Sequence, residues 1–139
     1  MSLMNTGIDK FETKLPKVIS PTVHGIIDYA HAAFFFTVGV FCSRSNKRAA
    51  AAAFATSGFI LAQSLFTDYR FGIKPVFSFE THGKMDSVFA SSSWLIPQML
   101  GFRNTAAAKI FEVNSLAEAS VVGMTDWDSE LAHNERAAA

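Results

Sequence analysis

Two short motifs in this chain carry residue types that bind metals or form strong hydrogen bonds in apolar surroundings. They are His24-Gly25-x-x-Asp28 and His82-Gly83-x-x-Asp86. Residues four apart share one face of a helix, so each motif would present an imidazole and a carboxylate together. Two such pairs suit zinc, manganese or non-haem iron, and two axial imidazoles could instead hold a haem.

A second repeated feature, Thr-Asp, follows two apolar stretches, as Thr67-Asp68 and Thr125-Asp126. A carboxylate at the C-terminal end of a helix is disfavoured by the helix dipole, so each aspartate needs a hydrogen-bond donor. We expect His24 and His82 to be these donors, because an imidazole can supply the N–H that the aspartate lacks.

The preferred interpretation is therefore structural: the repeated polar groups form hydrogen-bonded clasps between helices, and no cofactor is required. The expected clasp residues are His24, Asp28, Thr67, Asp68, His82, Asp86, Thr125 and Asp126. The alternative is a divalent metal or a haem, with the metal held by His24, Asp28, His82 and Asp86. A Glu-x-x-His pattern, common in di-metal helical bundles, is absent.

The spacing of these motifs indicates an internal repeat, because a shift of 58 residues superposes them without a gap. Further identities under the same shift are Val18/Val76, Ser20/Ser78, Ala32/Ala90, Asn46/Asn104, Ala49/Ala107, Ala50/Ala108 and Ser57/Ser115. We predict one hairpin over residues 18–69 and a second over 76–127. Residues 1–17 precede the repeats, 70–75 connect them and 128–139 form a polar tail.

Each repeat contains two apolar segments of helical length. Half of the residues are apolar and only 17% are charged. The first segment, residues 22–42, would reach about 30 Å as a helix, which is the thickness of the hydrocarbon core of a bilayer. The second segment, 49–66, returns after a short basic turn. The sequence therefore predicts an all-α protein, a four-helix transmembrane bundle of two tandem hairpins.

The second repeat is less regular than the first. Its first segment, residues 81–102, contains Pro97, which predicts a kink near the end of that helix. Its last segment, 105–125, carries polar residues that a helix surrounded by lipid would avoid. They are Lys109, Glu112, Asn114 and Glu118. We expect this helix to face protein or the bundle to be only partly immersed.

Before the repeats, apolar residues recur at helical spacing: Met4, Ile8, Phe11 and Leu15. This pattern predicts an amphipathic helix on the membrane surface within residues 1–17. A cleavable signal peptide is not expected, because Asp9 and Glu12 interrupt the segment.

The chain resembles the small bacterial membrane proteins with SPW repeats over about residues 15–127. The resemblance rests on 15–21 (LPKVISP), 64–69 (SLFTDY), the second His-Gly-x-x-Asp motif, Trp94-Leu95 and Gly101-Phe102. The naming tripeptide departs from the family pattern, with Ser92-Ser93-Trp94 in the second repeat. The resemblance implies a four-helix integral membrane domain of the bacterial inner membrane without an established activity.

The composition also restricts the function classes. Twelve basic and twelve acidic residues cancel, so nucleic-acid binding is not expected. One cysteine, Cys42, excludes an internal disulfide and a multi-thiolate metal site. No serine or cysteine lies in a nucleophile motif, so the expected role is non-enzymatic. We expect an accessory protein whose partners are the bilayer and other membrane subunits, with a small ion or proton transporter as a further alternative.

Overall fold

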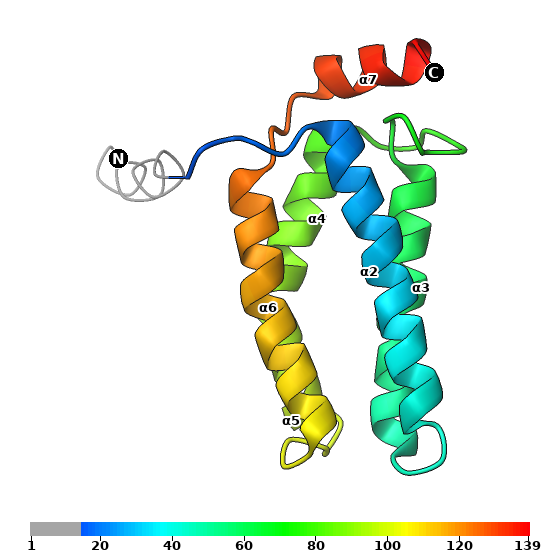
Figure 1. The fold of residues 1–139 in the computed structure, drawn as a ribbon, viewed down its shortest axis with the longest axis vertical. Helices are drawn as coiled ribbons and strands as arrows, with labels where there is room; N and C mark the ends of the chain where they lie inside the picture. The colour runs from blue at the N-terminus through cyan, green and yellow to red at the C-terminus, as the bar shows by residue number, and fades with distance from the viewer. Residues whose placement is uncertain (1–14) are drawn as a thin grey trace.

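The computed structural model describes residues 15–139, and these are helical, with no strand beyond two isolated β-bridges. Two helical hairpins stand side by side, and a last helix crosses one end of them (Figure 1). The first hairpin consists of α2 (Pro21–Cys42) and α3 (Lys47–Phe66), and the second of α4 (Phe79–Ser92), η1 (Ser93–Leu95), α5 (Ile96–Met99) and α6 (Ala106–Met124). The crossing helix is α7 (Ser129–Ala137). An all-α fold is confirmed.

Local capping explains where the helices begin. The hydroxyl of Ser20 accepts a hydrogen bond from Val23 N at the start of α2, and Ser78 accepts one from Thr81 N at the start of α4. Such side chains satisfy backbone N–H groups that the first turn leaves unpaired. Asn46 caps α3 and Thr105 caps α6 in the same way.

The helix expected over residues 81–102 is broken. It ends as α4 at Ser92, passes through one 3₁₀ turn and finishes as the short α5. Pro97 lacks the N–H that a continuous α-helix would direct to the carbonyl of Ser93, which accounts for the irregularity there. The polar C-terminal tail expected over 128–139 is largely helical, as α7. The surface helix expected over Met4–Leu15 lies almost entirely outside the described residues.

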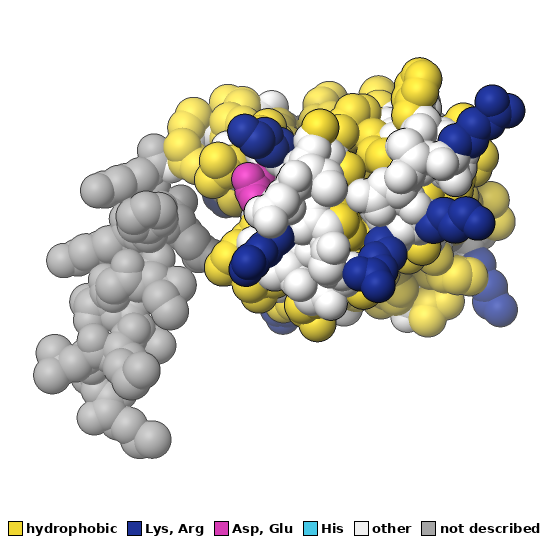
Figure 2. Space-filling view, turned by 90° about the horizontal axis from the view of Figure 1, so that it is seen from below, with side chains coloured by type: hydrophobic (Ala, Val, Ile, Leu, Met, Phe, Trp, Pro, Cys, Tyr) yellow, Lys and Arg dark blue, Asp and Glu magenta, His cyan; other side chains and the backbone are white. Residues whose placement is uncertain are grey.

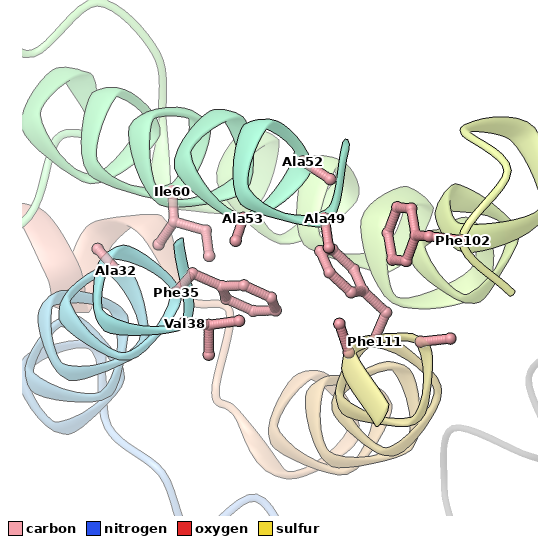
Figure 3. Packing of buried hydrophobic residues seen from close by; sticks show 11 residues of the cluster. Ala32, Phe35, Val38, Ala49, Ala52, Ala53, Ile60, Phe102 and Phe111 are labelled. Atoms are coloured by element: carbon pink, nitrogen blue, oxygen red, sulfur yellow. The ribbon is translucent and has the colours of Figure 1, made fainter. Parts of the chain in front are cut away.

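The apolar core lies between the hairpins and within each of them. Phe35 of α2 and Phe111 of α6 are fully buried, with ring centroids 5.1 Å apart. Alanines of α3 belong to the same buried cluster and lie on one side of these rings, where their small side chains allow close helix packing (Figure 3). Of the polar residues on α6, Asn114 and Glu118 are buried whereas Lys109 and Glu112 are exposed. The buried face of α6 therefore carries the side-chain amide of Asn114 and the carboxyl group of Glu118.

The outer surface of the helices is strongly apolar. Large hydrophobic side chains exposed along the helices include Phe34, Phe36, Val40, Phe41, Phe54, Phe59, Leu61, Val88, Val113 and Leu116. Figure 2 views the end that carries the short turns. Lysine and arginine side chains are spread over this face among backbone and uncharged side chains, and hydrophobic side chains lie towards its edges. Among the described residues, α2 and α3 are long and apolar enough to cross a membrane.

Several contacts recur at positions 58 residues apart. Parallel β-bridges join Ile19 to Thr125 and Phe77 to Thr67. Within each hairpin a serine hydroxyl donates to a backbone carbonyl of the neighbouring helix. These hydrogen bonds run from Ser57 to Ala32 O and from Ser115 to Ala90 O.

Candidate metal centre

Four side chains from the first turns of α2 and α4 meet between the two hairpins. We call them the His–Asp cluster: His24, Asp28, His82 and Asp86. One ligand atom from each can be chosen so that all four atoms lie within 4.8 Å of one another. The residues are almost completely buried, with exposed fractions between 0% and 5%.

Both imidazoles direct Nε2 at the carboxylates. His24 Nε2 lies 3.3 Å from Asp28 Oδ1 and 3.1 Å from Asp86 Oδ2. His82 Nε2 lies 3.3 Å from Asp28 Oδ2 and 3.2 Å from Asp86 Oδ2. Charge-assisted N–H···O bonds are usually about 2.7–2.9 Å long. His82 Nε2 makes no hydrogen bond of acceptable geometry to any described residue.

The other ring nitrogen of each histidine is bound to a threonine. His82 Nδ1 lies 2.7 Å from Thr67 Oγ1, and that hydroxyl donates its own proton to Gln63 O. A hydroxyl that has already donated can only accept, so Nδ1 must carry the proton. Each Nε2 is then either a free lone pair or the N–H of an imidazolium.

The second histidine is held in the same way by the other hairpin. His24 Nδ1 lies 2.9 Å from Thr125 Oγ1, which donates to Val121 O. Histidine ligands of metals characteristically donate their second N–H to a fixed acceptor, which orients the ring. Both histidines of the cluster show this arrangement.

The carboxylates also have protein partners, both from the end of α3. Ser64 Oγ donates to Asp28 Oδ2 at 3.1 Å, and Gln63 Nε2 donates to Asp86 Oδ1. Gln63 and Ser64 are not among the clasp residues expected from the sequence. Their signal was present, since they are two adjacent polar residues in the otherwise apolar last turns before Thr67.

Aromatic rings cover the cluster at the end where α7 lies. The ring centroid of Trp127 is 4.6 Å from that of His24 and 4.8 Å from that of Phe79. Tyr69 stacks on Phe79, and Ala132 of α7 is buried in the same group. Burial raises the pKa of the Tyr69 hydroxyl well above its ordinary value, so Tyr69 remains neutral beside the cluster.

The glycines of the motifs make room for these rings. A Cβ atom on Gly83 would lie 2.6 Å from a ring carbon of Trp127. A Cβ atom on Gly25 would overlap the ring of Tyr69 and lie 2.8 Å from Phe71. The glycine between histidine and aspartate therefore gives an aromatic side chain direct contact with the helix backbone.

The expected hydrogen bonds from the histidines to Asp68 or Asp126 are wrong. Asp68 instead pairs with His133 at 2.8 Å and lies 3.7 Å from Arg136 Nε, both on α7. The Asp68 carboxylate at the C-terminal end of α3 does have donors, and α7 provides them. The histidines contact Asp28 and Asp86 and the two threonines, so six of the eight expected clasp residues lie together and the two Thr-Asp aspartates are not among the histidine partners.

The arrangement fits a divalent metal better than a haem. Two neutral imidazoles and two carboxylates balance a charge of +2, and N₂O₂ donor sets suit Zn²⁺, Mn²⁺ or Fe²⁺. A haem would need the two Nε2 atoms on opposite sides of a flat ring. Here both face the same pair of carboxylates, and the imidazole centroids are only 5.3 Å apart.

No protein-family model, curated protein or solved structure matches this chain.

Proposed function

We propose that this chain is a membrane-embedded accessory protein in which two duplicated hairpins are tied together by one divalent metal ion in the His–Asp cluster, with Zn²⁺ as the best-fitting ion. The role is structural and not enzymatic. Its partners are the bilayer and other membrane proteins. The resemblance to SPW-repeat proteins of the bacterial inner membrane supports the same location.

The apolar exterior supports the membrane location. Helices α2 and α3 have the length and composition of membrane spans. The shorter α4 and α6 accompany them, and the large hydrophobic side chains exposed along all four helices would otherwise face water. Exposed apolar surfaces of this extent are typical of membrane or protein contacts. The buried position of Asn114 and Glu118 keeps them away from lipid.

The recurrence of contacts at a spacing of 58 residues supports duplication. The equivalent pairs include the β-bridges Ile19–Thr125 and Phe77–Thr67 and the two serine hydrogen bonds between helices. Because each hairpin has an even number of crossings, the halves would be related by an axis along the membrane normal. All repeated polar groups would then lie at one face of the membrane.

The observation that carries the metal proposal is the tautomer of the two histidines. Nδ1 of each ring is committed to a threonine, so Nε2 faces two carboxylates at 3.1–3.3 Å. Ligand atoms about 2.0–2.1 Å from a tetrahedral metal lie about 3.3 Å apart, which matches these separations. The two ligand atoms that lie farthest apart, at most 4.8 Å from each other, would move closer together when the ion binds.

A closed set of four protein ligands is typical of structural metal sites, whereas catalytic sites keep an open position. The ligands come from α2 and α4, and their hydrogen-bond partners come from α3 and the segment after α6. The ion would therefore join both hairpins. This role combines the expected helix clasp with the metal alternative.

Metal analysis of the protein purified in mild detergent tests the proposal. We expect about one divalent ion per chain, and reconstitution with Co²⁺ should give the visible absorption of a tetrahedral site. Chelation should lower the melting temperature and Zn²⁺ should restore it, because an ion that binds only the folded state stabilises it. Acid should release the ion as protons compete for the ligands.

The matched variants are Asp86→Asn in the cluster and Asp126→Asn outside it. The first should remove most of the bound metal and the second should leave it unchanged. If the protein contains no metal and its melting temperature changes with neither chelator nor Zn²⁺, the cluster is an imidazolium–carboxylate clasp. Release of the protein from membranes by alkaline carbonate would separately contradict the membrane location.

A further inference from the structure

The end of the bundle that carries the short turns contains basic residues without acidic ones. The two turns and the helix start beside them hold Arg44, Lys47, Arg48 and Arg103, and Figure 2 shows lysine and arginine side chains over this face. No aspartate or glutamate occurs in residues 29–67 or 87–111. The next acidic residue, Glu112, lies six residues into α6, about 9 Å along the helix. This end therefore carries a net positive charge.

The opposite end, near α7, pairs basic side chains with acidic ones. Lys84 Nζ lies 2.9 Å from Glu80 Oε1, and Arg136 Nε lies 3.7 Å from Asp68 Oδ1. Among residues 15–139, no arginine of the short turns forms an ion pair with a carboxylate. The counter-charge of the turn end therefore comes from outside the described chain.

The two hairpins bring two of these arginines close together. Arg48 of the first hairpin lies against the turn of the second, because a Cβ atom on Gly101 would lie 2.7 Å from Arg48 Nη1. Arg103 follows Gly101 by two residues, so their Cα atoms are at most about 7 Å apart. Both arginines are exposed. Two guanidinium groups on flexible side chains this close repel each other unless an anion lies between them.

A largely apolar groove begins beside Arg48. It has a volume of about 440 Å³ and is lined by Arg48, Ala51, Gln98, Met99, Leu100 and Gly101. The side chains of Met99 and Leu100 are 80% and 45% exposed. An exposed cation thus stands directly at the edge of an exposed apolar surface. This combination fits an amphiphile that has an anionic head and an apolar tail.

We propose that this site binds an anionic phospholipid of the bilayer, with its phosphate group between Arg48 and Arg103 and an acyl chain along Ala51, Met99 and Leu100. Arginine suits this role, because its planar guanidinium donates two parallel hydrogen bonds to a phosphate. The inference rests on the membrane location proposed above but not on the metal.

The position of the turns along the bundle agrees with a lipid headgroup. Helix α2 has 22 residues and is therefore about 33 Å long. In a hydrocarbon core about 30 Å thick, the turn after α2 lies at the boundary of the core, where phospholipid phosphates lie. Anionic lipids at this boundary attract basic side chains next to membrane helices. This location favours a lipid over an acidic segment of a soluble partner.

Titration of the full-length protein in a non-ionic detergent tests the proposal, with native mass spectrometry as the readout. The probes are dioleoyl phosphatidylglycerol, which is anionic, and dioleoyl phosphatidylcholine, which has the same acyl chains and no net charge. We expect one phosphatidylglycerol per chain to bind about tenfold more tightly than phosphatidylcholine. About 0.5 M NaCl should reduce this preference, because salt screens exposed charges.

Substitutions of the arginines test the headgroup contacts. Arg48→Gln and Arg103→Gln should each weaken the binding of phosphatidylglycerol about fivefold and leave that of phosphatidylcholine unchanged. Arg70→Gln is the matched control, because Arg70 is also exposed but precedes α4 at the opposite end. It should leave the binding of both lipids unchanged.

A bulky side chain tests the apolar part of the site without changing its charge. Ala51 is exposed and lines the groove, so Ala51→Trp should fill the groove and weaken the binding of phosphatidylglycerol about tenfold. Ala33→Trp, at an exposed position of α2 that does not line the groove, should have no effect. Circular dichroism of each variant checks that it is folded, which exposed positions should permit.

Equal affinity for the two lipids, or equal losses in Arg48→Gln and Arg70→Gln, would overturn the proposal. Displacement of the lipid by an equal concentration of inorganic phosphate would overturn it in favour of a soluble anion. If alkaline carbonate leaves the protein in membranes but neither lipid is preferred, only this inference fails. If carbonate releases the protein, the membrane location fails and this inference fails with it.

Discussion

The two hairpins are alike at one end and different along the rest of their length. Helices α2 and α3 are continuous over 22 and 20 residues, whereas the chain from Phe79 to Met99 is divided into α4, η1 and α5. At the end near α7, however, both hairpins supply a histidine, an aspartate, a threonine and a glycine whose backbone contacts an aromatic ring. The comparison teaches that the polar end restricts the sequence far more than the apolar helices do.

The physical reason is the difference between apolar and polar burial. Apolar packing against lipid or against other helices tolerates many side chains of similar volume. A buried imidazole or carboxylate tolerates few neighbours, because each unsatisfied polar group costs free energy. In the His–Asp cluster nearly every polar atom has a partner, and many of these partners lie on the other hairpin. A substitution in either hairpin should therefore destabilise both.

The largest expected effect comes from removing a carboxylate. Asp28→Ala and Asp86→Ala should each lower the free energy of unfolding by about 3–5 kcal/mol, because each leaves two buried imidazoles with one carboxylate. Denaturation in detergent micelles, followed by circular dichroism, measures the effect. Asp126→Ala, outside the cluster, is the control. Losses that differ by more than about twofold between the two variants would show that the hairpins contribute unequally.

A smaller effect is expected at the glycines. Gly25→Ala and Gly83→Ala should destabilise the protein by about 1–3 kcal/mol, since the added methyl group displaces an aromatic ring. Gly25→Ala should be the worse of the two, because its Cβ atom would overlap the ring of Tyr69 and also lie 2.8 Å from Phe71, whereas the nearest atoms to a Cβ atom on Gly83 all belong to Trp127, at 2.6 Å or more. Thermal melts and the near-ultraviolet dichroism of the rings report both effects. Gly58→Ala, where a Cβ atom meets nothing within 4 Å, is the matched control and should be neutral or stabilising.

The smallest effect concerns the serines that join the helices within each hairpin. Ser57→Ala and Ser115→Ala each remove one hydrogen bond to a backbone carbonyl, at Ala32 and Ala90 respectively. Each should cost about 0.5–1.5 kcal/mol. Equal losses in the two hairpins would sharpen the comparison. A loss confined to Ser57→Ala would show that the broken second hairpin packs less tightly.

Much of the helical content and part of the site could be predicted from the sequence. Hydrophobic segment lengths and the basic turn indicated the first hairpin, and the spacing of histidine and aspartate indicated a shared helix face. The predicted partner of the histidines failed because the dipole argument considered only the charge of Asp68 and not the direction of each ring. Once Thr67 and Thr125 accept from Nδ1, Nε2 faces the aspartates of the two motifs.

Other features depend on contacts that no local pattern specifies. Arg136 of α7 donates to the carbonyl of Gly72, and Glu135 accepts from Thr22 at the start of α2. A short polar segment with a capping aspartate predicts at most a marginal helix by itself. Its docking on residues far away in the sequence makes α7 part of the fold. The roles of Gln63 and Ser64 likewise become visible only when α3 is placed beside the cluster.

The crossed threonine contacts bear on how such a protein could have arisen. Thr67 follows the last helix of the first hairpin but orients His82 of the second. Thr125 follows the last helix of the second hairpin but orients His24 of the first. A half-length ancestor with one motif would have left its own histidine without a threonine. Two copies related by twofold symmetry would have satisfied both, so the duplication proposed above would have a homodimer as its natural precursor. Coexpressed half-chains, one ending and one starting within residues 70–75, should therefore assemble with each other, and failure to recover them as a complex would argue against this origin.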